Sequence, residues 1–160
     1  MRLFIAVQMS DEIKGALLAC MHDLKRQGIK GNYVPEQNLH LTLAFIGDYE
    51  NTAKVRKAME SVPEANFRLE LSKCGNFGNI LWSGVEKNGH LDTYVKELRA
   101  ALEAFGIPFD KKKFVPHITL VRRASRKPHE IYIPKAAMSV EKASLMKSEM
   151  KDGKVEYTEV

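Results

Sequence analysis

Two short stretches of the chain alternate between polar and apolar residues and share the pattern His-x-Thr-x, with apolar residues at each x. The first is His40 to Leu43 and the second is His117 to Leu120, one in each half of the 160 residues. Strict alternation predicts half-buried β-strands, in which residues two apart lie on the same face. Each strand therefore presents an imidazole and a hydroxyl side by side, roughly 7 Å apart at the Cα atoms. The alternate residues would anchor the other face in a core: Leu41, Leu43, Ile118 and Leu120.

The segments around each motif predict a similar series of elements in the two halves of the chain. The first half predicts a buried strand at 2–8, a helix capped by Ser10 and stopped by Gly28, a helix at about 52–62 and a strand at 67–71. The second half predicts strands at 80–85, 114–121 and 136–150, a turn at Asn88-Gly89, a helix at about 91–105 and a hairpin turn at Asp152-Gly153.

This repeated plan predicts an α+β fold of two pseudo-symmetric lobes. Their antiparallel sheets would line a central cleft, with the helices on the outside. No linker rich in Pro, Gly or Ser separates the halves, so residues 1–160 are expected to form a single domain. Phe45 has the same parity as Leu41 and Leu43 and is therefore expected in the core.

The residue types of the two motifs suit proton transfer at a phosphate. Histidine is the side chain whose ordinary pKa makes both protonation states accessible near neutral pH. Two histidines can act as base and acid in one reaction, because one ring can accept a proton from water while the other donates one to a leaving oxygen. We therefore expect His40 and His117 to be catalytic. The hydroxyls of Thr42 and Thr119 and the charge of Arg122 suit the non-bridging oxygens, where negative charge needs stabilising in the transition state.

In these residues and their flanks the chain resembles the 2H phosphoesterases, a superfamily defined by two His-x-[Ser/Thr]-x motifs. Within it, the chain is most similar to the RNA 2′,3′-cyclic phosphodiesterases, also called 2′-5′ RNA ligases. The resemblance covers nearly the whole chain, including the opening strand at 2–7, the motif segments 39–47 and 116–122, and the late hairpin at 148–157.

The resemblance implies an enzyme that hydrolyses RNA 2′,3′-cyclic phosphodiester ends to 2′-phosphomonoesters, with O3′ as the leaving oxygen. Some relatives also catalyse the reverse reaction, which joins RNA ends through a 2′-5′ bond. The two histidines would be acid and base, and we expect His117 to be the base and His40 the acid. The threonines would hold the phosphate, and Arg122 would face the substrate. Tyr33 replaces a tryptophan expected just upstream of the first motif and is the candidate for stacking on a nucleobase.

The composition is ordinary for a soluble globular protein, with 44% hydrophobic and 28% charged residues. The two cysteines form no disulfide framework, and the apolar run at 3–7 is too short for a signal peptide or a membrane span. These features predict a cytoplasmic protein, expected to be a monomer. The net charge of +5 and the pI of about 9.2 are compatible with a polyanionic partner such as RNA. Two basic runs bracket the second motif, Lys111–Lys113 and Arg122–Lys127, and either contact RNA or form a solvated surface.

Two other kinds of chemistry fit the sequence less well. Neither motif contains a carboxylate or a thiol, so a zinc site is disfavoured and no metal is expected. No phosphate-binding glycine loop or dinucleotide fingerprint is present, so no cofactor is expected. From a different class, the chain could be a binding module that holds nucleotides or RNA in the same cleft without turnover. Two intact histidines argue against this alternative, because binding alone does not need two titrating groups.

Overall fold

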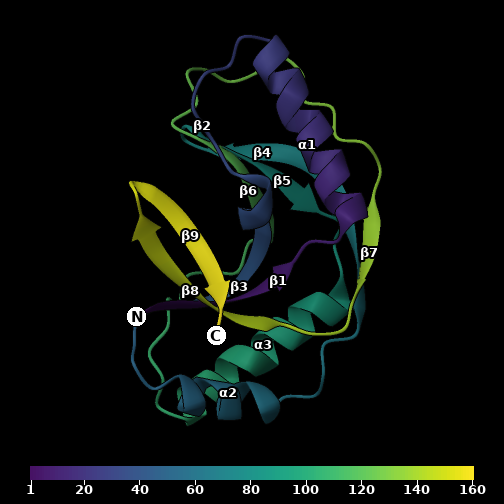
Figure 1. Cartoon of the computed structure of the whole chain (residues 1–160). Coiled ribbons are helices and arrows are strands. Elements are labelled where there is room, and N and C mark those ends of the chain that lie inside the picture. The colour runs from purple at the N-terminus through teal and green to yellow at the C-terminus, as the bar shows by residue number, and fades with distance from the viewer.

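The computed structural model describes residues 1–160 and has an α+β fold with two antiparallel sheets (Figure 1). The first sheet has the order β3-β1-β8-β9, formed by His40–Asp48, Arg2–Gln8, Ser144–Lys151 and Lys154–Glu159. The second has the order β2-β6-β5-β4-β7, formed by Asn32–Tyr33, His117–Arg122, Ile80–Val85, Phe67–Phe77 and Ala137–Val140. This arrangement confirms the predicted α+β fold with two antiparallel-sheet lobes.

Three α-helices flank the sheets. Helix α1 (Asp11–Arg26) lies beside β6 and β7, whereas α2 (Thr52–Glu60) and α3 (Gly89–Ala104) pack together, with α3 against β3 (Figure 1). A short 3-10 helix, η1 (Glu36–Asn38), leads into β3. Ser10 caps α1 as predicted, because its hydroxyl oxygen accepts a hydrogen bond from the backbone N–H of Ile13 at 3.2 Å. None of these helices has both the length and the apolar character that crossing a membrane requires.

The two predicted tight turns have different outcomes. Asn88 does not form a turn with Gly89 but caps α3, where its side-chain oxygen accepts from the backbone N–H of His90 at 2.9 Å. An asparagine amide bonds to nearby backbone in both turns and caps, so the Asn-Gly pair alone does not distinguish them. The hairpin turn between β8 and β9 is confirmed, since Asp152 (φ 52°) and Gly153 (φ 77°) both adopt the positive φ that such a turn requires.

The two lobes are not the two halves of the chain. Helix α1 packs on the second sheet and α3 on the first, while β8 and β9 return at the end of the chain to complete the first sheet. The single strand predicted at 136–150 is therefore wrong: it is β7, which pairs with β4, followed by β8, which pairs with β1. An apolar run predicts a strand but does not identify its partner. One core cluster of 35 buried residues extends through both lobes.

Strand β3 changes face directly after its motif threonine. Its pairing with β1 skips Leu43, so that Thr42 and Ala44 face consecutive residues of β1. An extra residue in one strand reverses which side chains point to each face beyond it. The prediction that Phe45 lies in the core is therefore wrong: its side chain is 37% exposed, and the guanidinium of Arg2 lies 5.3 Å from its ring centroid.

Strand β6 contains the same irregularity at the equivalent place. Its pairing with β5 skips Leu120, so that Thr119 and Val121 face consecutive residues of β5. Strict alternation would point Arg122 away from His117, toward the core. The extra residue instead turns the exposed Arg122 to the face that carries the motif side chains.

Candidate active site

The fold brings the two motif strands together although they belong to different sheets. Strands β3 and β6 lie side by side, with Cα atoms within 8 Å of one another. The charges of His117 and Arg122 both act on the imidazole of His40 and lower its pKa. The pairing of the two motifs predicted from the sequence is thus a feature of the tertiary structure, in which the lobes meet along these strands.

The His40 imidazole is oriented by its own backbone. Its Nδ1 lies 2.6 Å from the carbonyl oxygen of Asn38, and because a carbonyl only accepts, Nδ1 must carry the hydrogen. In the neutral ring, Nε2 is then an unprotonated acceptor. The Thr42 hydroxyl lies 2.9 Å from this Nε2 and donates to it. The two side chains of the first motif are therefore joined, with Nε2 held beside the hydroxyl.

Two aromatic rings enclose the same imidazole. The ring centroids of Phe4 and Tyr157 lie 5.0 and 5.1 Å from that of His40, and Tyr157 meets it edge-on. Burial lowers the pKa of His40 below its ordinary value, because the charged ring loses water. The bond to the Asn38 carbonyl opposes this effect, while the positive charges of Arg122 and His117 lower the pKa further. These environments favour the neutral form of His40 in the free protein.

His117 is held in a similar way by different residues. Its Nδ1 donates to the carbonyl oxygen of Val115 at 2.7 Å, again two residues earlier in the chain. The ring of Phe77 meets the imidazole edge-on at 5.0 Å, and the indole of Trp82 lies 6.0 Å away. No hydrogen bond joins Nε2 of His117 to Thr119, so this nitrogen is free to meet a ligand or a water.

A cavity of about 950 Å³ lies beside the first motif and contains two of the other predicted residues. It is lined by Tyr33 and Arg122 from the second sheet, by Asn38, and by Tyr157 and other residues of the β8-β9 hairpin. Because Tyr157 packs on His40, the cavity ends next to this imidazole. The geometry therefore brings Arg122 and Tyr33 to one cleft beside the motifs.

Tyr33 is more constrained than a free stacking residue would be. Its hydroxyl donates to the carbonyl oxygen of Ile29 at 2.7 Å, and the ammonium of Lys25 lies 4.7 Å from its ring centroid. Burial raises the pKa of the Tyr33 hydroxyl, so it stays protonated. Lys25 thus occupies one side of the ring, and a nucleobase would have to approach from the cavity.

Several residues of the site were not predicted from the sequence. The aromatic residues around the two imidazoles come from β1, β4, β5 and β9: Phe4, Phe77, Trp82 and Tyr157. In a strand an aromatic side chain is an ordinary core residue, so only the pairing of strands reveals its contact with a histidine. The carbonyls of Asn38 and Val115 have no sequence signal at all, since any residue provides one.

The basic runs on either side of β6 are partly engaged within the protein. Lys111 lies 3.6 Å from the Glu103 carboxylate, and its ammonium is 5.9 Å from the ring centroid of Phe109. Arg126 donates to the carbonyl oxygen of Gln27 and thereby ties its loop to the end of α1. Neighbouring lysines and arginines, including Lys113 and Arg123, are exposed.

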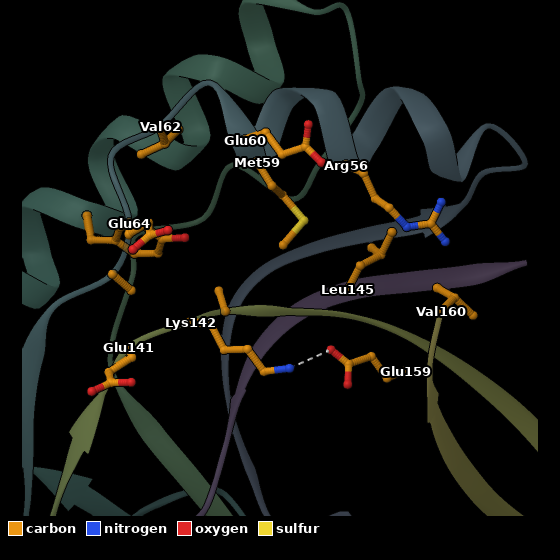
Figure 2. Close-up of a pocket in the computed structure, with 13 residues that line it drawn as sticks. Arg56, Met59, Glu60, Val62, Glu64, Glu141, Lys142, Leu145, Glu159 and Val160 are labelled. Atoms are coloured by element: carbon orange, nitrogen blue, oxygen red, sulfur yellow. Dashed lines mark hydrogen bonds and ion pairs between the residues drawn. The ribbon is translucent and has the colours of Figure 1, made fainter.

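A second cavity, of about 580 Å³, contains none of the predicted residues (Figure 2). It lies between α2 and the segment that leads from β7 into β8, and Lys142 pairs with Glu159 on the side opposite α2 at 3.4 Å. Leu145 lines this cavity and belongs to the main core, whereas the next residue, Met146, packs with Phe4 near His40. The cavity therefore lies on the other face of the first sheet. No three His, Cys, Asp or Glu side chains in the protein gather into a group that could hold a metal ion.

Comparison with known proteins identifies the family of the chain. Residues 10–152 match the family described as the 2′-5′ RNA ligase superfamily, and the chain belongs to this family. It is 32% identical over 132 residues to the RNA 2′,3′-cyclic phosphodiesterase of Thermotoga maritima, covering 76% of this chain and 70% of that protein. The resemblance inferred from the motifs is confirmed.

Solved structures resemble the whole fold. A crystal structure of a Thermus thermophilus protein superimposes with a TM-score of 0.84 at 30% identity, covering 100% of this chain and 95% of that one. Escherichia coli LigT in complex with 3′-AMP superimposes with a TM-score of 0.82 at 27% identity, covering 99% of this chain and 94% of that one.

Proposed function

We propose that this protein is an RNA 2′,3′-cyclic phosphodiesterase that uses His40 and His117 as a metal-independent acid–base pair. The observation that carries the proposal is the matched presentation of the two imidazoles. Each donates Nδ1–H to a backbone carbonyl two residues earlier, and each leaves Nε2 as the reactive nitrogen on neighbouring strands. The curated relatives named for this activity support the choice of substrate. The cleft needs both sheets, so we take residues 1–160 as one 2H phosphoesterase domain.

In the proposed hydrolysis, Nε2 of His117 removes a proton from a water molecule while the oxygen of that water attacks phosphorus. The P–O3′ bond breaks, and His40 gives its Nε2 proton to O3′, which leaves a 2′-phosphomonoester. The reverse direction, with a hydroxyl in place of water, would form a 2′-5′ bond. Thr42, Thr119 and Arg122 bind the non-bridging oxygens, where they stabilise the negative charge of the transition state.

Two features of the site support these roles. Nε2 of His117 has no hydrogen bond to Thr119, so its lone pair is available to a water. The lowered pKa of His40 makes its protonated form the stronger proton donor, and the anionic phosphate favours that protonated form when the substrate binds. Tyr33, at the cavity wall, is proposed to contact the base next to the cyclic phosphate.

The first test is turnover without metal. The protein is expected to hydrolyse cytidine 2′,3′-cyclic phosphate in the presence of EDTA and to release only the 2′-phosphate, as measured by chromatography of the products. A loss of activity that a divalent ion restores would contradict the metal-independent mechanism. Release of the 3′-phosphate would show that O3′ is not the leaving group. Nucleotide binding without any turnover would favour the binding module instead.

In the same assay we expect a bell-shaped pH dependence of kcat/KM, which reports the groups of the free enzyme. The acid works only when protonated, so the protonation of His40 determines one limb of this profile. Because that pKa is lowered, the limb that reports His40 is expected below the ordinary histidine value of about 6.5. A His40→Asn variant should retain residual activity without this limb, whereas an unchanged limb would assign it to another group.

A further prediction concerns the three lysines that precede β6. Replacing Lys111, Lys112 and Lys113 with Ala should weaken binding of single-stranded RNA while leaving turnover of a cyclic mononucleotide nearly unchanged. Removing one lysine–phosphate contact should make the log–log salt slope of affinity shallower by about 0.7. The control replaces Lys54, Lys57 and Lys96, on α2 and α3, which changes the net charge equally. Equal salt slopes in both triple variants would identify the predicted cluster as a solvated surface.

A further inference from the structure

The chain has a single tryptophan, Trp82, and the fold places it beside one of the two motif histidines. Its side chain lies 6.0 Å from the His117 ring centroid, and Phe77 contacts both rings at 5.0 Å. Trp82 pairs across β5 and β6 with Thr119, while His117 itself faces Gly84. The indole and Phe77 thus form the two aromatic contacts of the imidazole.

Gly75 sets the position of the indole. It pairs with Trp82 across β4 and β5, and a Cβ atom there would lie 2.3 Å from Cη2 and 2.4 Å from Cζ2 of the indole. The six-membered ring therefore rests directly on the backbone of Gly75. A Cβ at Gly84 would lie 2.7 Å from the carbonyl oxygen of Lys73 and 3.5 Å from Cζ3 of the indole. Any larger residue at Gly75 must therefore displace the indole from its present position.

The indole Nε1 is the one buried side-chain nitrogen or oxygen in the protein that has no hydrogen-bond partner. A buried donor without an acceptor is unfavourable, and a phenylalanine at this position would avoid it. What the tryptophan adds over a phenylalanine is its larger ring, which lies against Gly75 and within 6.0 Å of the imidazole centroid.

The first lobe holds its histidine by the same kind of contact with unrelated residues. Phe4 and Tyr157 lie 5.0 and 5.1 Å from His40, and both motif histidines also donate Nδ1–H to a carbonyl two residues earlier. At His117 a single hydrogen bond leaves the ring free to tilt about it. Two aromatic contacts in addition hold its plane, which determines where Nε2 points.

We propose that Trp82, seated on Gly75, is a positioning residue that holds the plane of the His117 imidazole and so directs Nε2 to the attacking water. The proposal rests on the proposed function, because the direction in which Nε2 points affects turnover only if His117 takes part in the reaction. Trp82 itself does not take part in proton transfer. Its contribution is the contact between the indole and the imidazole.

The contact is tested first without any substrate. A protonated imidazole quenches an indole that it touches, so the emission of Trp82 should follow the protonation of His117 in a pH titration. This pH-dependent change in emission should disappear in a His117→Asn variant and persist in a His40→Asn variant. An identical titration curve in the wild type and His117→Asn would overturn the proposed contact, and this result does not depend on whether the protein hydrolyses cyclic phosphates.

The consequence for catalysis is tested with a pair of variants. Trp82→Leu should lower kcat for a cyclic mononucleotide by roughly 10–100-fold with KM near its wild-type value, because a small misplacement of a reacting group costs this much. Trp82→Phe, which keeps a ring but not the reach of the indole, should recover only part of the activity. Gly75→Ala should lower kcat in the same way while the tryptophan is still present.

Phe105→Leu is the control, since it removes a ring from the end of α3 that packs on the core without contacting a histidine. It should lower the melting temperature but not kcat at a temperature where the protein is folded. A folded Trp82→Leu variant with wild-type kcat would overturn the positioning role. If the wild-type protein shows no turnover, the proposed function fails, while the nitrogen NMR shifts of the His117 ring in Trp82→Leu still test whether the indole orients it.

Discussion

Replacing either His40 or His117 with alanine is expected to lower kcat for a 2′,3′-cyclic nucleotide by roughly 10²–10⁴-fold, the usual contribution of general acid–base catalysis. Substrate affinity should change much less, because the threonines and Arg122 remain to bind the phosphate. The double variant should be little worse than either single one, since the two imidazoles act in one proton-transfer step. Steady-state kinetics with purified variants measures all three effects.

His90→Ala is the matched control, because His90 is exposed near the start of α3 and belongs to neither motif. It should retain wild-type kcat. Near wild-type turnover in either His40→Ala or His117→Ala would contradict the two-histidine mechanism. Effects that multiply in the double variant would show that the two residues act in separate steps.

Replacing Arg122 with alanine is expected to lower kcat by roughly 10²–10³-fold, the usual effect of removing one group that stabilises a developing oxyanion. The change of face after Thr119 is what turns this side chain to the motif side of β6. Arg122→Lys should recover part of the activity, because it keeps the charge but not the two-pronged geometry of a guanidinium.

The same variant has a second readout with a defined sign. The positive charge of Arg122 lowers the pKa of His40, so its removal should raise that pKa and move the limb of the kcat/KM profile that reports His40 to higher pH. Arg123→Asn is the control: Arg123 is the next residue, has a φ of 55°, and an asparagine tolerates this conformation. If Arg123→Asn lowered kcat as much as Arg122→Ala, the effect would come from the loss of a positive charge in this region and not from the position of the Arg122 side chain.

The sequence was most informative where a pattern is local and repeated. Alternation around the two motifs predicted the two strands, and the side chains at Ser10 and Asp152-Gly153 predicted a helix cap and a hairpin turn that the structure contains. These features depend on residues a few positions apart, so neighbouring side chains and backbone are sufficient to determine them. The same reasoning was wrong at Asn88, because an Asn-Gly pair is compatible with both a turn and a helix cap.

Long-range pairing decided the rest of the site. The register shifts at Leu43 and Leu120 depend on which residues of β1 and β5 face them, and they moved Phe45 out of the core and Arg122 to the motif face. The aromatic contacts of the histidines join strands that are far apart in the chain.

The sequence by itself determined that the chain has two histidine strands in an α+β fold, because side-chain alternation is an intrinsic property of a strand. Only the tertiary structure decided how segments of the two halves interleave into lobes, which rings hold His40 and His117, and which way Arg122 points. These outcomes depend on contacts between distant segments, which form when the whole core is buried and which no local pattern encodes.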